Sequence, residues 1–277
     1  MRLIAFMTTD DDHSRPAGAS ILVPLLHPDE PAPFRILRPE GRSDMVLTAD
    51  HAGRVIPRRL GTLGLPQSEL DRHIGWDIGI AGVTERLSRA LDATAIFQTY
   101  SRLVIDCNRS PEVPTSIPEI SEATEIAGNR NLSPADRLIR RREIFAPYHD
   151  CIDRILDARA ARRTVLVAMH SFTPVFRGES RAMQVGVLYN RDPKLARILL
   201  DLLRAEPGLT VGDNAPYSVS DLTDYTVPVH AERRGLPHVE IEIRQDLIAD
   251  PEGEAAWADR FTGLLTEADR RLRDSTQ

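Results

Sequence analysis

The sequence predicts an α/β protein with three layers, α/β/α, built on a mainly parallel but mixed sheet. Three observations predict this fold. Short apolar runs have the length of buried strands, stretches with helical apolar spacing lie between them, and the runs end abruptly in reactive polar residues. Strands that alternate with helices form a parallel sheet covered on both faces. Because ligands of open α/β sheets bind outside the carboxyl ends of the strands, we expect one active site there.

Length and composition favour one soluble globular domain. The chain has 277 residues, 42% of them hydrophobic and 27% charged, and a net charge of -6. This mild acidity argues against nucleic acid or an anionic membrane as the main partner. No apolar run approaches the roughly 20 residues of a membrane span, and no secretory signal is recognisable. The two cysteines, Cys107 and Cys151, make no disulfide framework, so we expect structural thiols and a cytoplasmic location.

The N-terminal region lacks a regular pattern. Residues 1–35 are rich in proline and in polar residues, which predicts a loosely ordered leader with one edge strand near 21–26. We expect a single catalytic domain over 36–277, since no linker interrupts it.

The first half of this domain begins with an apolar strand at 45–49. A helix is predicted over 78–91, because apolar side chains recur there at helical spacing. Strands are expected at 95–98 and 103–105. The prolines between 111 and 118 then predict an irregular loop.

The second half begins with a helix that Ser133 caps and Pro134 starts, with Asp136 three residues after the cap. Pro147 is expected to break or kink this helix before it resumes. Further elements follow along the chain. They are strands at 164–169, 184–188 and 239–243, a helix from Asp192-Pro193 through Leu202, and a terminal helix at 253–272.

A catalytic zinc takes about three ligands from His, Asp or Glu and leaves one position open. His51 and His170 are the natural candidates, because each follows an apolar strand. Asp77 is our first choice for the third ligand, although an Asp in front of a helix is also a typical N-cap. Asp50 and His73 remain alternatives.

Two arginines and an asparagine surround the 103–105 run. A guanidinium can bind a carboxylate in a bidentate fork or stabilise an oxyanion, so Arg102, Asn108 and Arg109 are expected at the substrate. Asp106 is a possible ion-pair partner for the arginine, which would make the arrangement merely structural.

Glu240 and Glu242 alternate along a strand and therefore share a face. Near a metal, one of them could act as general base toward water. Pairing with Arg244 on the same face is the structural alternative. Tyr217, in a loop, and His230, whose pattern indicates exposure, are expected as substrate contacts.

Taken together, these motifs resemble the N-formylglutamate amidohydrolase family from about residue 40 to the C-terminus. The family is distantly similar to zinc carboxypeptidases and aspartoacylases, which implies a phosphorylase/hydrolase-like α/β/α fold. The motifs are Asp50-His51-Ala52-Gly53 with Ile56-Pro57, Ser101-Arg102 through Asp106-Cys107-Asn108-Arg109, His170-Ser171-Phe172-Thr173-Pro174, Asn214-Ala215-Pro216-Tyr217-Ser218, and His230 through Glu242-Ile243-Arg244-Gln245-Asp246-Leu247.

The resemblance implies roles for residues in four of these motifs. His51 and His170 become ligands of one zinc ion, Asn108 and Arg109 bind the substrate carboxylate, Glu242 is the base and Arg102 polarises the scissile carbonyl. The more distant relatives carry an acidic ligand three residues after the first histidine, where this chain has Arg54. This departure is the reason for turning to Asp77.

The expected function is a zinc-dependent amidohydrolase that cleaves an N-formyl or N-acyl amino acid, plausibly N-formylglutamate. Its partner is then a small molecule. A carboxypeptidase-like zinc peptidase and a non-catalytic binding protein of the same fold are the alternatives.

Overall fold

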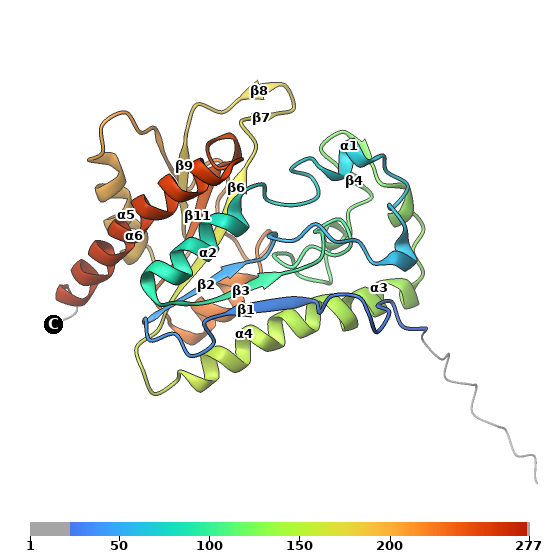
Figure 1. Ribbon diagram of the computed structural model, residues 1–277, viewed down its shortest axis with the longest axis horizontal. Coiled ribbons are helices and arrows are strands. Elements are labelled where there is room, and N and C mark those ends of the chain that lie inside the picture. The colour runs from blue at the N-terminus through green and yellow to red at the C-terminus, as the bar shows by residue number, and fades with distance from the viewer. Residues whose placement is uncertain (1–22, 276–277) are drawn as a thin grey trace, which may run out of the picture.

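The computed structural model describes residues 23–275 and contains a seven-stranded sheet (Figure 1). The strands lie in the order β1-β3-β2-β6-β11-β9-β10. Neighbours from β3 to β11 run parallel, whereas β1 is antiparallel to β3, and β9 and β10 run opposite to β11. The bounds are Phe34–Leu37 (β1), Met45–Ala49 (β2), Thr94–Gln98 (β3), Val165–Phe172 (β6), Val185–Leu188 (β9), Val211–Asp213 (β10) and His238–Arg244 (β11).

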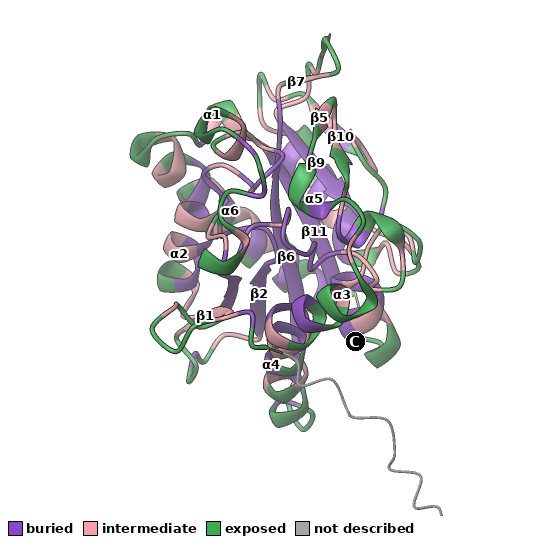
Figure 2. Cartoon of the chain, turned by 90° about the vertical axis from the view of Figure 1, so that its right-hand side faces the viewer, coloured by how far each residue is buried: buried purple, intermediate pink, exposed green. Residues whose placement is uncertain are grey.

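This topology brings the carboxyl ends of β2, β6 and β11 together at one end of the strands, here called the carboxyl edge of the sheet. All residues of β2, β3, β6 and β9 are buried, as Figure 2 shows for the central strands. Layers that cover both faces explain why these strands are continuous apolar runs. The predicted three-layer, mainly parallel mixed sheet is confirmed.

Three helices cover one face of the sheet: α2 (Ile80–Leu91), α5 (Lys194–Arg204) and α6 (Pro251–Asp274). Their apolar sides pack against alternate strand residues such as Leu47 and Phe97, and together they form the larger hydrophobic core. The predicted helices over 78–91, 192–202 and 253–272 correspond to these three.

The opposite face is covered by α3 (Pro134–Arg140), a π-helical turn at Arg141–Phe145 and α4 (Ala146–Ala158), below the sheet in Figure 1. Ser133 and Asp136 form the expected capping box at the start of α3. Pro147 does not break the run, which continues from α3 through the π-helical turn into α4. The wider π turn lies directly before Pro147, where the proline ring would clash with a regular α-helical turn.

The expected strand at 103–105 is wrong. These residues form a buried loop. Their side chains pack into a second hydrophobic core, which lies between the sheet and α4. Side chains satisfy their backbone in place of a neighbouring strand: Asn129 Nδ2 donates to Leu103 O at 2.8 Å, and Arg140 Nη1 donates to Val104 O at 3.0 Å. The run is therefore apolar because it is buried, although it pairs with no neighbouring strand.

The expected edge strand near 21–26 begins outside the described residues, and its described part, 23–26, is not a strand. This segment nevertheless packs on the body of the protein. Leu25 is buried, and its N–H donates to Glu143 Oε2 at 2.9 Å. Much of the leader expected over 1–35 lies outside the described residues.

Short elements lie near the carboxyl ends of the central strands. They are α1 (Gln67–Leu70) and two hairpins, β4–β5 (Ile120–Ser121 and Thr124–Glu125) and β7–β8 (Val175–Phe176 and Glu179–Ser180).

Within residues 23–275, no helix is long and apolar enough to span a membrane.

Candidate active site

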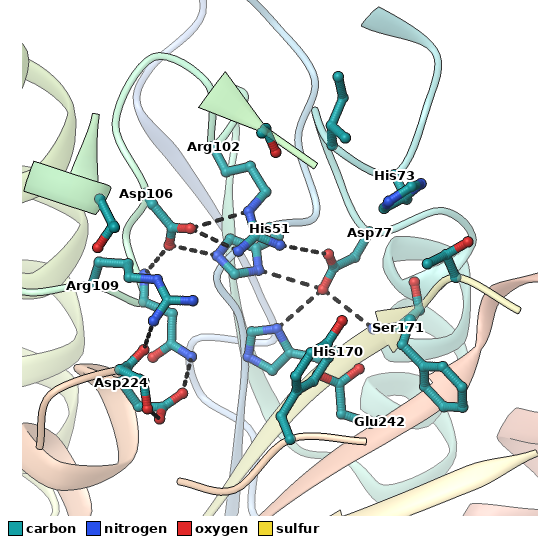
Figure 3. Close-up of a pocket in the computed structure, with 18 of the residues that line it drawn as sticks. His51, His73, Asp77, Arg102, Asp106, Arg109, His170, Ser171, Asp224 and Glu242 are labelled. Atoms are coloured by element: carbon teal, nitrogen blue, oxygen red, sulfur yellow. Dashed lines mark hydrogen bonds and ion pairs between the residues drawn. The ribbon is translucent and has the colours of Figure 1, made fainter. Parts of the chain in front are cut away.

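A pocket of about 500 Å³ opens at the carboxyl edge of β2, β6 and β11 (Figure 3). Its size is typical of sites for small molecules. Eleven of the candidate residues from the sequence line it. They are His51, His73, Asp77, Arg102, Asp106, Asn108, Arg109, His170, Tyr217, Glu240 and Glu242.

Three buried side chains form the centre of the pocket: His51, Asp77 and His170. His51 follows β2, His170 lies near the end of β6, and Asp77 precedes α2. The N–H of Asp77 donates to the carbonyl of His51 at 2.9 Å, which fixes the two segments against each other. Gly53 is required nearby, because a Cβ there would lie 2.0 Å from the carbonyl oxygen of Thr99.

The two imidazoles turn the same atom toward Asp77. Its Oδ2 lies 3.4 Å from His51 Nδ1 and 3.0 Å from His170 Nδ1. On the far side of each ring, Nε2 faces a second carboxylate: Asp106 Oδ1 at 2.8 Å from His51, and Asp50 Oδ2 at 3.3 Å from His170. A carboxylate behind a histidine is the arrangement that orients metal-binding imidazoles.

These three side chains could hold a metal ion. Their candidate ligand atoms lie within 4.8 Å of one another, and all three residues are buried. His51 Nδ1 is buried without a hydrogen-bond partner among the described residues. This nitrogen lies 3.4 Å from Asp77 Oδ2, and a cation between the two atoms would satisfy both. Two imidazoles and one carboxylate are also a typical donor set for zinc.

The alternatives for the third ligand lie elsewhere. Asp50 accepts hydrogen bonds from the hydroxyls of Tyr148 and Thr226, at 2.7 and 2.8 Å, so it supports His170 from behind. His73 lines the pocket but faces Glu122 at 3.5 Å. Asp77 is not the helix cap considered above. The N-cap of α2 is Gly79, and Asp77 Oδ2 instead accepts from the N–H of Ser171 at 3.2 Å.

Glu240 and Glu242 lie on the face of β11 that points toward this cluster, and Glu242 is in register with His170. Burial raises the pKa of Glu242 to about 7, although the nearby histidines oppose the shift. Burial also raises the pKa of Glu240, well above its usual range. Neither glutamate pairs with Arg244, which binds Asp246 at 2.8 Å.

Arg102 is held by two carboxylates. Its Nε and Nη2 donate to Asp106 Oδ2 at 3.1 and 2.7 Å, and its Nη1 lies 3.5 Å from Asp77 Oδ1. The ion pair with Asp106 that was the structural alternative is therefore present. Arg102 still lines the pocket, so the same guanidinium orders the cluster and borders the ligand space.

Asn108 and Arg109 are adjacent in the pocket wall but differ in how many of their polar groups are already paired. The side-chain oxygen of Asn108 accepts from the N–H groups of Tyr225 and Thr226, both at 3.0 Å, and its amide donates to Asp224 at 3.2 Å. Asn108 therefore anchors the 224–226 segment. Arg109 donates to the carbonyl of Thr223 and, within the described chain, forms no ion pair.

The two remaining candidates, Tyr217 and His230, lie in different places. Tyr217 lines the pocket, and its hydroxyl accepts from Arg181 Nη1 at 3.0 Å. The expectation for His230 is wrong: it is fully buried and lies away from the pocket wall. It pairs with His149 at 2.8 Å and with Asp153 at 2.9 Å. An exposed pattern in sequence does not reveal that the π-helical turn at Val227–Ala231 buries this ring against α4.

Several pocket residues were not predicted. Asp224 stands beside Arg109, and Phe172, Phe176 and Ile120 add an apolar part of the wall. Phe172 belongs to the His170-Ser171-Phe172-Thr173-Pro174 motif, so its place could have been inferred. The two short hairpins that carry Ile120 and Phe176 leave little pattern in the sequence.

Comparisons with known proteins identify the family of this chain. The family model for N-formylglutamate amidohydrolase matches residues 43–249. A solved structure of gene product Atu2144 from Agrobacterium tumefaciens is 37% identical, covers 90% of this chain and 99% of its own, and has a TM-score of 0.87. Among curated proteins, none matches the chain.

A solved N-formylglutamate amidohydrolase from Ralstonia eutropha JMP134 is 20% identical, covers 88% of this chain and 99% of its own, and has a TM-score of 0.65. This likeness concerns the fold. The family match, in contrast, spans most of the chain and includes the three residues of the central cluster. The chain belongs to the N-formylglutamate amidohydrolase family.

Proposed function

We propose that this protein is a zinc-dependent amidohydrolase that cleaves the amide of an N-formyl or N-acyl amino acid, with N-formylglutamate as the first substrate to test. The observation that carries the proposal is the buried group of His51, Asp77 and His170 with Glu242 beside it. Amide hydrolysis requires a polarised carbonyl, an activated water and a proton donor for the amine, and this group can supply all three.

The metal would be held by His51, Asp77 and His170. Zinc, when bound, supplies a Lewis acid that lowers the pKa of water and polarises a carbonyl group. Asp106 and Asp50 keep the two imidazoles oriented from behind, as second carboxylates do in other metal sites.

Glu242 is the proposed general base. A carboxyl group with a pKa of about 7, raised chiefly by burial, is partly ionised near neutral pH. It can therefore take a proton from water and return it to the leaving amine. Burial raises the pKa of Glu240 well above its usual range as well. Glu242 is in register with His170, whereas Glu240 is in register with Ala168, so we assign the base to Glu242.

The substrate is oriented by two arginines. Arg109, which forms no ion pair within residues 23–275, binds the α-carboxylate of the amino acid in a bidentate fork. Arg102, held in place by Asp106, stabilises charge that develops on the carbonyl oxygen. Asn108 contributes indirectly, because it fixes the segment that contacts Arg109.

The test is a pair of matched variants, Glu242→Gln and Glu240→Gln, assayed on N-formyl and N-acetyl amino acids after reconstitution with zinc. We expect Glu242→Gln to lower kcat by at least about 10²-fold with zinc still bound, which is the usual contribution of a general base. Glu240→Gln changes the carboxyl group that is in register with Ala168 and not with His170, and it should cost less than about tenfold.

The reverse order of these two effects would contradict the assignment of the base. A peptide panel in the same assay separates the proposal from a carboxypeptidase-like activity, which would favour short peptides over acyl amino acids. A protein that neither binds zinc nor releases amine from any of these compounds would contradict the enzymatic function.

A further inference from the structure

We propose that the pocket accepts an apolar acyl group larger than formyl, which packs against an aromatic wall formed by Phe172, Phe176 and Tyr217. This inference rests on the proposed function and specifies its substrate class as N-acyl amino acids with an aliphatic or aromatic acyl chain.

The aromatic wall comes from three separate segments. Phe172 ends β6, Phe176 lies on the β7–β8 hairpin, and Tyr217 belongs to the loop after β10, yet all three line the pocket. Ile120, on the β4–β5 hairpin, lines the pocket as well. Tyr217 is 43% exposed and Ile120 59% exposed. Large apolar side chains gathered at one pocket mark a surface made for an apolar ligand.

Arg181 holds the three rings together. Its guanidinium carbon lies 5.7, 4.8 and 4.9 Å from the ring centroids of Phe172, Phe176 and Tyr217. Its Nη1 also donates to the Tyr217 hydroxyl at 3.0 Å. Contact with three aromatic faces fixes the cation by cation–π attraction. Arg181 does not line the pocket, so it acts as a positioning residue behind the wall.

Arg109 and the end of β6, which carries Phe172, lie on opposite sides of the central cluster. Figure 3 shows Arg109 on one side of His51 and His170, and Ser171, the residue before Phe172, on the other. A substrate whose α-carboxylate is bound by Arg109 and whose amide carbonyl lies at the cluster extends its acyl group away from Arg109. That direction leads to the aromatic wall.

The charged side chains named at the aromatic wall are already engaged, so they do not call for a polar acyl group. Arg181 is held by the three rings and the Tyr217 hydroxyl. Glu122 accepts from Arg72 and from the N–H of Arg177. A formyl group has no carbon chain and would leave the rings uncovered. The cavity of about 500 Å³ has room for a longer chain.

The experiment measures kcat/KM for N-formyl, N-acetyl, N-butanoyl, N-hexanoyl and N-succinyl derivatives of leucine and of glutamate, with the zinc-loaded full chain. We expect kcat/KM to rise at least about tenfold from N-formyl to N-butanoyl, since one well-packed methylene in an apolar pocket contributes about that much. A constant or falling series, or a preference for N-succinyl, overturns the inference and leaves the amidohydrolase intact. Hydrolysis of none of the compounds overturns the proposed function too.

A variant pair assigns the preference to the aromatic wall. Phe176→Ala removes a ring from the wall, and we expect it to lower the ratio of kcat/KM for N-hexanoyl over N-formyl by about tenfold. Val175→Ala is the matched control, because Val175 precedes Phe176 on β7 and is exposed but does not line the pocket. An unchanged ratio in Phe176→Ala, or an equal fall in Val175→Ala, overturns the assignment.

Discussion

Two pairs of buried histidines lie on the same face of the sheet, and their rings are almost equally close. The ring centroids of His51 and His170 are 4.9 Å apart, and those of His149 and His230 are 5.0 Å apart. The first pair meets edge to face at 65°, whereas the second is stacked at 13°. Residue type, burial and distance therefore do not distinguish a candidate metal site from an ordinary core contact.

The surroundings distinguish them. His51 and His170 are enclosed by the carboxylates of Asp50, Asp77 and Asp106. Burial alone lowers the pKa of an imidazole, but these carboxylates overcome it and raise the pKa of His51, while Glu240, Asp50 and Asp77 raise that of His170 well above its usual value. The pocket is thus built to surround positive charge.

The second pair has no comparable surplus of negative charge. His149 bonds to the carbonyl of Cys107 at 2.8 Å and to His230, and one half-exposed carboxylate, Asp153, faces His230. Burial therefore dominates and lowers the pKa of His149 to about 3, and it lowers that of His230 as well. This pair is a neutral packing contact between α4 and the turn at Val227–Ala231.

The largest expected difference between the pairs is in metal content. His51→Gln and His170→Gln each remove one of three candidate ligands, so we expect bound zinc to be lost. We also expect kcat/KM to fall by about 10³-fold or more. This exceeds the roughly 10–100-fold loss that is typical when a residue that hydrogen-bonds to a metal ligand is changed. His149→Gln and His230→Gln should keep one zinc per chain. Metal analysis of the four purified variants, with circular dichroism to confirm folding, checks this comparison.

A folded His51→Gln protein that retains zinc would contradict the metal site. Loss of zinc in folded His149→Gln would erase the distinction between the two pairs. The glutamine variants keep a hydrogen-bonding side chain at each position, so they separate ligation from packing.

A smaller effect is expected at the carboxylates behind the rings. Asp106→Asn weakens the support of His51 Nε2, and we expect zinc affinity to fall by about 10–100-fold, measured by competition with a chelator. Asp153→Asn alters the carboxylate that faces His230 and should leave zinc affinity unchanged. Equal zinc affinities in the two variants would show that the second carboxylate does not support the site.

The sequence predicted the first pair better than the second because of where the residues lie along the strands. His51 and His170 follow long buried apolar runs, and those runs are strands whose carboxyl ends meet at one edge. The 103–105 run has the same composition but is a loop, because side chains of Asn129 and Arg140 satisfy its backbone. Apolar composition predicts burial, and only a ladder partner makes a strand.

The sequence predicted less well which carboxylates contact the first pair of histidines. Asp106 reaches His51 across 55 positions of sequence, and Asp77 reaches His170 across 93. Asp77 resembled a helix cap, and its actual contacts depend on how α2 packs against the end of β6. His230 was misjudged for a similar reason, since its partner His149 is 81 positions away.

The smallest expected effect concerns stability at low pH. In the unfolded chain a histidine titrates near 6.5, whereas burial keeps His149 neutral in the folded state down to a pKa of about 3. Between these values the unfolded state binds more protons, so His149 destabilises the fold increasingly as pH falls, by about 2 kcal/mol at pH 5. His149→Gln removes this titration. In urea unfolding of the metal-free proteins, the stability of the wild type relative to His149→Gln should therefore drop by about 2 kcal/mol between pH 8 and pH 5. A difference that stays constant with pH would mean that His149 has the same pKa in the folded and in the unfolded state, which would contradict this prediction.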